Sequence, residues 1–132
     1  LRSIKLATPA RSPMGIELRR QLALQPNVRV VEAEKDAEVV MLVLEDRVDR
    51  GVSASTSVGQ VREFNVTTHF RFRLRTPAGR ELIGPTELSL AQPLTYNETD
   101  ALAKEAEETE LVQGMRRDIA AQVLRRLEAV KL

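Results

Sequence analysis

Residues 61–76, VREFNVTTHFRFRLRT, alternate apolar and polar side chains along most of their length. Successive side chains of a β-strand point to opposite faces, so this alternation predicts one long strand with an apolar and a polar face. The apolar face would carry Phe64, Val66, Phe70, Phe72 and Leu74, and the polar face Asn65, Thr67, His69, Arg71, Arg73 and Arg75. All 3 phenylalanines of the chain lie in this strand, so its apolar face should be the core face, covered by helices.

A strand, a helix and a second strand are predicted before this segment. The alternating residues 3–8 form the first strand, and residues 28–32 form the second. Between them, Ser12 is a suitable N-cap, Pro13 is preset for the first helical position, and Pro26 ends the helix. The helix carries an apolar stripe at every fourth residue: Met14, Leu18 and Leu22. So short a unit favours a right-handed crossover between two parallel strands.

Strands are also predicted on both sides of residues 61–76. The consecutive apolar residues 39–44 are typical of a central strand covered on both faces, and the polar residues after them should stay extended, with a bend at Gly51. Pro77 and Gly79 predict a hairpin turn after the alternating strand. The returning strand contains Pro85, which cannot donate a ladder hydrogen bond and therefore indicates an edge position or a bulge.

Residues 97–130 form one long helical pattern. Asn97 and Asp100 resemble a capping box at its start. An apolar stripe follows at Leu111, Met115, Ile119, Val123 and Leu127. Such a helix would be about 50 Å long, whereas a compact domain of this size has a radius of gyration of about 14 Å. The helix should therefore bend, with Gly114 as the place, or project beyond the body at one end.

This order of elements predicts an α+β fold. We expect a two-layer α/β sandwich with a mixed sheet of four to five strands, two helices on one face and a long C-terminal helix. Residues 1–132 should form a single domain, because a chain of this length can bury a core without metal or disulfide bonds.

The residue types argue against an enzyme. The chain has no cysteine, which excludes disulfides and thiolate metal sites, and its only histidine, His69, has no carboxylate nearby in the sequence. It has no glycine-rich phosphate loop and no nucleophile-elbow serine, and no apolar run reaches the roughly 20 residues of a membrane-spanning helix. We therefore expect no catalysis, no metal and no cofactor.

The polar face of the long strand allows two interpretations. It could be an ordinary solvated strand face. Alternatively, Arg71, Arg73 and Arg75 form a ridge about 14 Å long that suits phosphate or carboxylate groups. Net charge is only +1, and the exposed face carries no aromatic residue on which bases could stack, so a nucleic-acid reader is disfavoured.

Residues 94–127 resemble the C-terminal region of a known family. The matching features are Tyr96, Leu102-Ala103-Lys104, Glu107-Glu108, Met115-Arg116, Asp118 and Leu124-Arg125-Arg126-Leu127. The turn and strand GQVREFNV at residues 59–66 is similar to the central hairpin of the same family. That family is the lipopolysaccharide-assembly lipoproteins, LptE, also called RlpB. The order of elements matches over essentially the whole chain.

The resemblance implies a non-enzymatic lipoprotein of the Gram-negative outer membrane, on its periplasmic side. Such proteins sit as a plug in a large β-barrel, LptD, and assist lipopolysaccharide transport to the cell surface. Their lipid anchor is an N-terminal cysteine after a signal peptide, neither of which is present here, so we expect both to lie upstream of Leu1.

Five basic residues are candidate lipopolysaccharide contacts: Arg62, Lys104, Arg71, Arg73 and Arg75. Lys104 could instead pair with Glu108 on its own helix, and Arg62 could be a charge that protects a strand edge. The alternative function is a stand-alone module that binds an anion or nucleic acid with its arginine-rich sheet face.

Overall fold

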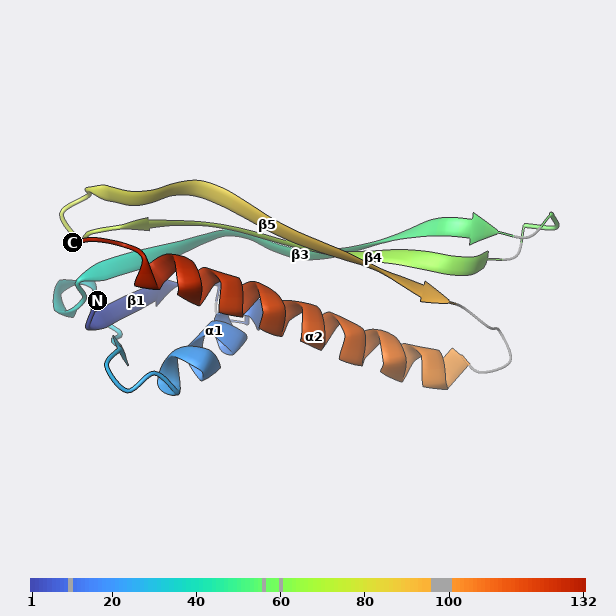
Figure 1. The fold of residues 1–132 in the computed structure, drawn as a ribbon, viewed down its shortest axis with the longest axis horizontal. Coiled ribbons are helices and arrows are strands. Elements are labelled where there is room, and N and C mark those ends of the chain that lie inside the picture. Colours follow the sequence, from blue (N-terminus) through green and yellow to red (C-terminus); the bar gives the residue numbers. More distant parts are fainter. Residues whose placement is uncertain (10, 56, 60, 96–100) are drawn as a thin grey trace.

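The described residues form one mixed five-stranded sheet with the strand order β2-β1-β3-β4-β5. The computed structural model describes residues 1–9, 11–55, 57–59, 61–95 and 101–132, apart from the side chains of Ala54, Val61, Arg62 and Ala101. Along the chain the elements are β1 (Ser3–Ala7), α1 (Pro13–Ala23), β2 (Arg29–Val30), the 3₁₀ turn η1 (Glu34–Asp36), β3 (Val39–Ser55), β4 (Val61–Arg75), β5 (Glu81–Thr95) and α2 (Ala101–Glu128). Both α-helices lie on the same side of the sheet (Figure 1). The predicted α+β sandwich is confirmed.

The first half of the chain makes two crossovers on opposite faces of the sheet. β1 pairs with β2 and with β3, in both cases in parallel. The chain moves outward from β1 to β2 and then back to β3, and right-handed crossovers in opposite directions place their connections on opposite faces. Accordingly, α1 lies on the apolar face, whereas η1 reaches the polar face, where Glu34 accepts a hydrogen bond from Arg75 at 2.6 Å.

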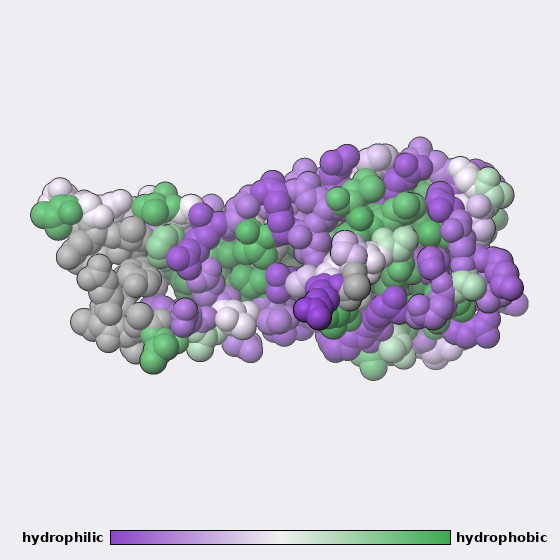
Figure 2. Space-filling view, turned by 180° about the vertical axis from the view of Figure 1, so that it is seen from behind, coloured by the Kyte–Doolittle hydropathy of each residue, from purple (hydrophilic) through white to green (hydrophobic). Residues whose placement is uncertain are grey.

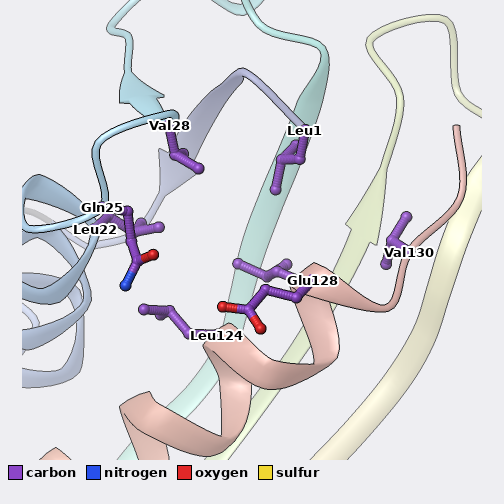
Figure 3. Close-up of a pocket in the computed structure, with 8 residues that line it drawn as sticks. Leu1, Leu22, Gln25, Val28, Leu124, Glu128 and Val130 are labelled. Carbon is purple, nitrogen blue, oxygen red and sulfur yellow. The ribbon is translucent and has the colours of Figure 1, made fainter.

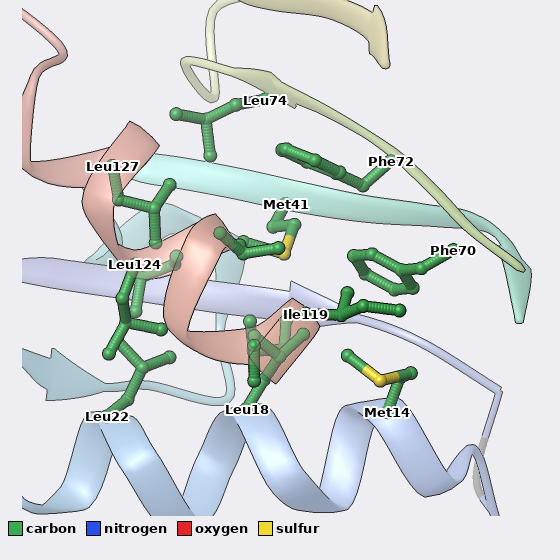
Figure 4. Close-up of a cluster of buried hydrophobic side chains, with 14 of the residues drawn as sticks. Met14, Leu18, Leu22, Met41, Phe70, Phe72, Leu74, Ile119, Leu124 and Leu127 are labelled. Carbon is green, nitrogen blue, oxygen red and sulfur yellow. The ribbon is translucent and has the colours of Figure 1, made fainter. Parts of the chain in front are cut away.

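The core lies where both helices cover the sheet. Phe70 and Phe72 are fully buried and stack with ring centroids 5.5 Å apart. They face apolar side chains from the two helices and from β3 (Figure 4). The helix stripes predicted above are buried, apart from Leu111, which is only partly buried: Met14, Leu18 and Leu22 on α1, and Met115, Ile119, Val123 and Leu127 on α2. The assignment of faces along β4 is therefore confirmed.

The other half of the molecule is a narrower arm, which we call the distal arm. β1 pairs with β3 only at residues 39–42, whereas β3, β4 and β5 continue beyond as an antiparallel sheet covered by α2 alone (Figure 1). A second, smaller apolar cluster of Val66, Leu94 and Val112 fills this arm. Between the two clusters lies Thr68, which is 3% exposed and whose hydroxyl has no hydrogen-bond partner among the described residues.

The long helix does not break at Gly114. α2 is continuous from Ala101 to Glu128, and long strands run beside its first half (Figure 1). Neither outcome expected from the sequence is observed: within the described residues α2 has no break at Gly114 and no free projecting end, because β3, β4 and β5 extend beside it and the whole molecule is elongated (Figure 1). The predicted capping residues Asn97 and Asp100, and Tyr96 before them, lie outside the described residues.

β2 is shorter than predicted, whereas β3 stays extended past Gly51 as predicted. β2 contains only Arg29 and Val30, while β3 runs unbroken through Gly51 to Ser55 with register shifts on either side of Ala54. β5 is an edge strand, and Pro85 falls in the irregular stretch where the pairing with β4 shifts, as expected for a residue without an amide hydrogen.

Candidate functional site

A pocket of about 360 Å³ opens between the first turns of α2 and the strands of the distal arm. Its apolar part is formed by Phe64 on β4, Leu94 on β5 and Leu102 on α2. Leu94 is buried, whereas Leu102 is 82% exposed, so the apolar surface runs from the arm's interior to solvent. We call this the distal pocket. The charged residues that line it are Arg50, Lys104, Glu105 and Glu108.

Each cation of the distal pocket has a carboxylate partner. Arg50 reaches from β3 to α2, where its Nη1 donates to Glu108 Oε2 at 2.7 Å. The Arg50 guanidinium also lies over the Phe64 ring, 4.3 Å from its centroid, as in a cation–π contact. Lys104 Nζ donates to Glu107 Oε2 at 2.9 Å, so this lysine pairs with Glu107 and not with Glu108 as the sequence suggested.

A wider groove of about 660 Å³ continues from the distal pocket along α2. Val48 and Val112 contribute apolar surface to it, and Arg50 and Leu102 line both spaces. Arg116 also lines the groove, and its buried Nε has no hydrogen-bond partner among the described residues. Pocket and groove together form a continuous hollow with a mixed apolar and charged lining.

The predicted arginine ridge lies on the opposite face of the sheet from the distal pocket. Arg75 is engaged by Glu34, and this hydrogen bond holds the pKa of the Glu34 carboxyl below its ordinary value. Arg71 is exposed and stands in register between Glu45 and Glu87, and no ion pair involves Arg71 or Arg73 in the described part of the chain. Arg73 has a buried Nε with no hydrogen-bond partner among the residues that the structure describes. The structure therefore separates the ridge from Lys104.

Arg62 stands near the start of β4, in the distal arm, but its side chain lies outside the described residues. Two of the five candidates, Arg62 and Lys104, thus belong to the distal arm. The other three form the ridge.

His69 joins the three long strands across the polar face. Its Nε2 lies 3.1 Å from Asp49 Oδ2 on β3, and its Nδ1 lies 3.1 Å from Glu87 Oε1 on β5. The hydrogen bond to His69 lowers the pKa of Glu87. Arg47 pairs with both Glu45 and Asp49. Neither carboxylate is predictable from the residues around His69 in the sequence, because both reach it across strand pairs.

No group of histidine, aspartate and glutamate residues in the described ranges has the arrangement of a metal site. No described helix is long and apolar enough to cross a membrane. Hydrophilic side chains cover much of the surface seen in Figure 2, and the hydrophobic areas at the narrow end are small and separate.

A second, largely apolar cavity of about 230 Å³ lies at the end of the molecule away from the distal arm. It is surrounded by Leu1 before β1, by leucine side chains of both helices and by the valines that follow each helix, with the polar groups of Gln25 and Glu128 beside them (Figure 3). It contains none of the candidate residues.

A family model described as LptE, lipopolysaccharide-assembly, matches residues 1–127. The chain belongs to the LptE family. A comparison with curated protein sequences gives no match. The match extends over both layers of the sandwich and the distal arm, so the family assignment covers the elements that build the distal pocket.

Solved structures with the same fold agree with the LptE assignment. The chain is 26% identical to uncharacterized lipoprotein B from Nitrosomonas europaea, with a TM-score of 0.86 over 96% of this chain and 82% of that one. The rare lipoprotein B from Shewanella oneidensis gives 23% identity and a TM-score of 0.81, covering 96% and 94%. The minor lipoprotein from Acinetobacter baumannii gives 19% identity and a TM-score of 0.76, over 98% of this chain and 93% of that one. The last two likenesses concern the fold.

Arg50 is the functional candidate that sequence reasoning missed. It lies in the polar stretch after the apolar run of β3, and nothing local distinguishes it from the arginine at position 47. Strand parity could have found it: Arg50 pairs with Val66, so its side chain lies on the apolar face, under α2.

Proposed function

We propose that this protein is a non-catalytic partner of an LptD-type outer-membrane barrel, acting as its plug and assembly partner in lipopolysaccharide transport. The observation that carries the proposal is the LptE family match over residues 1–127. The chemistry of the distal pocket and the adjoining groove also supports a binding role, because ion pairs and apolar side chains line both. We further propose that residues 1–132 work as one domain.

The surface suits a plug inside a barrel. The lumen of a large outer-membrane barrel is polar, so its occupant needs polar surfaces on several sides. The polar face of the sheet meets this need with the pairs around His69 and Arg47 and with Arg71 and Arg73, for which the described residues supply no ion-pair partner. We assign these two arginines to the barrel or to anionic glycolipid groups.

The distal pocket supports direct contact with lipopolysaccharide. An amphiphile with phosphate groups needs apolar surface beside cations, and the pocket offers Phe64, Leu94 and Leu102 beside Lys104. We place Lys104 and, next to the same arm, Arg62 among the contacts. The attachment that we propose is to the periplasmic side of the outer membrane, through a lipid anchor.

Co-purification tests the proposed partner. The full-length natural protein, tagged at its C-terminus, is expressed with the LptD-type barrel of the same organism and extracted in detergent. We expect a stoichiometric complex that survives gel filtration, and protection of the barrel against misfolding in cells. Recovery of the barrel in a folded state without this protein, together with absence of a complex, would exclude the proposal.

The alternative function is an anion-binding module that uses the ridge without a barrel. The observation that favours it is the pair Arg71 and Arg73, which lacks carboxylate partners in the described part of the chain. A salt-dependent gel shift with nucleic acid, in a protein that captures no barrel, would support this alternative.

A further inference from the structure

We propose that Arg50 is a further anion contact of the distal pocket, and that Glu108 occupies it until a phosphate group of the glycolipid displaces the carboxylate. This inference rests on the proposed lipopolysaccharide contact and adds to it a residue and an exchange step. The geometry that carries it is the position of one guanidinium between an aromatic ring, an acidic side chain and a pocket.

Arg50 is placed as a ligand contact would be. It lines both the distal pocket and the adjoining groove, so its guanidinium stands where the two hollows meet. Its side chain is 49% exposed, whereas the Glu108 side chain is 22% exposed. A ligand can therefore reach the guanidinium from solvent while the carboxylate stays against the protein.

The pocket as it stands is electrically balanced. Arg50 and Lys104 supply two positive charges, and Glu105 and Glu108 supply two negative charges. Lys104 is itself paired with Glu107. Both described cations that line this pocket are paired with carboxylates, so an anion that binds either of them must displace a carboxylate.

The exchange favours phosphate for two reasons. The Arg50–Glu108 pair is partly exposed, and exposed ion pairs hold their partners weakly. Phosphate offers more acceptor oxygens than a carboxylate, and guanidinium binds it with two parallel hydrogen bonds. The Phe64 ring, 4.3 Å away, keeps the guanidinium in position when Glu108 leaves.

The apolar side of the pocket selects the class of anion. Phe64, Leu94 and Leu102 lie beside Arg50, so an anion attached to a hydrocarbon chain gains from burial, whereas inorganic phosphate does not. The predicted ligand is thus a phosphorylated glycolipid, and its phosphate and acyl parts contribute together.

Binding measurements on charge variants test the exchange. The probes are lipid A with its phosphates, the same lipid after dephosphorylation, and inorganic phosphate, each titrated into the purified protein in detergent at two salt concentrations. Arg50→Gln should weaken binding of phosphorylated lipid A about fivefold or more, because a charge-assisted hydrogen bond is lost. Glu108→Gln should strengthen it about threefold, because the competing carboxylate is removed.

The double variant carries the sharpest expectation. With Arg50 absent, Glu108 has no guanidinium to occupy, so Arg50→Gln with Glu108→Gln should bind as weakly as Arg50→Gln alone. Arg47→Gln is the matched control, since Arg47 lies on the same strand and pairs with two carboxylates, but on the opposite face. Its affinity should equal that of the wild type. Circular dichroism and urea midpoints confirm that each variant folds.

Three results would overturn the exchange. If Glu108→Gln does not bind phosphorylated lipid A more tightly, the Arg50–Glu108 ion pair only links β3 to α2 and does not compete with the ligand. Equal losses in the Arg47 and Arg50 variants would reduce the effect to overall charge. A wild-type protein that binds no phosphorylated lipid, or binds the dephosphorylated form as well, would remove the phosphate contact and this inference with it. Capture of the barrel is scored separately, so the proposed partnership is judged on its own.

Discussion

Asp46 on β3 accepts a hydrogen bond from the Ser12 hydroxyl at 2.6 Å, and through it the sheet holds the start of α1. The same Asp46 oxygen accepts from the backbone N–H of Met14 at 3.2 Å, while Ser12 Oγ accepts from the N–H of Gly15 at 3.1 Å. The first turn of α1 is therefore capped by its own N-cap and by a carboxylate from a strand far away in the chain. A negative charge at a helix N-terminus is also favoured by the helix dipole.

We expect Asp46→Ala to lower the free energy of unfolding by about 1–2 kcal/mol, because two hydrogen bonds to the helix start are lost. Urea denaturation measures the change. Asp49→Ala is a suitable comparison, since Asp49 lies on the same strand but faces His69 and Arg47 on the polar side. A loss no larger for Asp46 than for Asp49 would show that the contact to α1 contributes nothing beyond a surface ion pair.

Phe70→Ala should lower the free energy of unfolding by about 3–5 kcal/mol, because it removes a large, fully buried side chain from the centre of the core. Chemical denaturation of the two proteins side by side gives the difference. Arg71→Ala, at the next position and on the exposed face, should change stability by less than about 0.5 kcal/mol. Similar losses in both variants would mean that the two faces of β4 are packed alike.

Arg71→Glu combined with Arg73→Glu should leave the fold intact and weaken capture of the LptD-type barrel or of anionic glycolipid. Neither arginine has an ion-pair partner in the described part of the chain, so the reversal breaks no pair, yet it turns the centre of the polar face negative. Co-purification and glycolipid binding are measured on the same preparations. Unchanged binding of both partners would return the ridge to a solvated strand face.

The Glu34–Arg75 contact should make stability fall at acid pH. Hydrogen bonding to Arg75 lowers the pKa of Glu34 in the folded protein, so the folded state binds its proton less readily than the unfolded state. The resulting stabilisation is complete above the unfolded-state pKa and disappears as the pH falls through the folded-state pKa. We therefore expect the urea midpoint of the wild type to exceed that of Glu34→Gln near neutral pH. The two midpoints should approach each other as the pH is lowered to about 2. Parallel curves for the two proteins would contradict this.

Sequence periodicity predicted the main elements of this fold because each has one face buried in the core and the other exposed to solvent. The alternation around Phe70 and Phe72 and the four-residue spacing of Leu18 and Leu22 follow directly from burial on one face. Pro85, which lacks an amide hydrogen, predicted an edge position or a bulge, and β5 is an edge strand whose register shifts at this proline. Each of these features can be predicted from one continuous stretch of sequence, because it depends only on the geometry of that helix or strand.

The site depends on contacts between segments distant in the sequence, which periodicity does not reveal. The Arg50–Glu108 pair links positions 58 residues apart, and Glu34 reaches Arg75 over 41. Lys104 follows from the motif of the family resemblance and Arg75 from the alternation of the strand, and neither signal shows that the two lie on different faces of the sheet. The continuous α2 has a similar cause: Gly114 can stay helical because neighbouring turns pack on strands long enough to accompany it.

Thr68 divides the apolar interior into a larger and a smaller cluster, and the two parts of the molecule should therefore differ in local stability. The smaller cluster contains only Val66, Leu94 and Val112 as buried residues of the described chain, so little apolar burial ties the arm's helix and strands together. The distal arm should therefore open locally at a smaller free-energy cost than the unfolding of the core that both helices cover. If the distal arm opens while the two-helix core stays folded, the arm can adjust its shape to an amphiphile of irregular form, and the rest of the fold is kept.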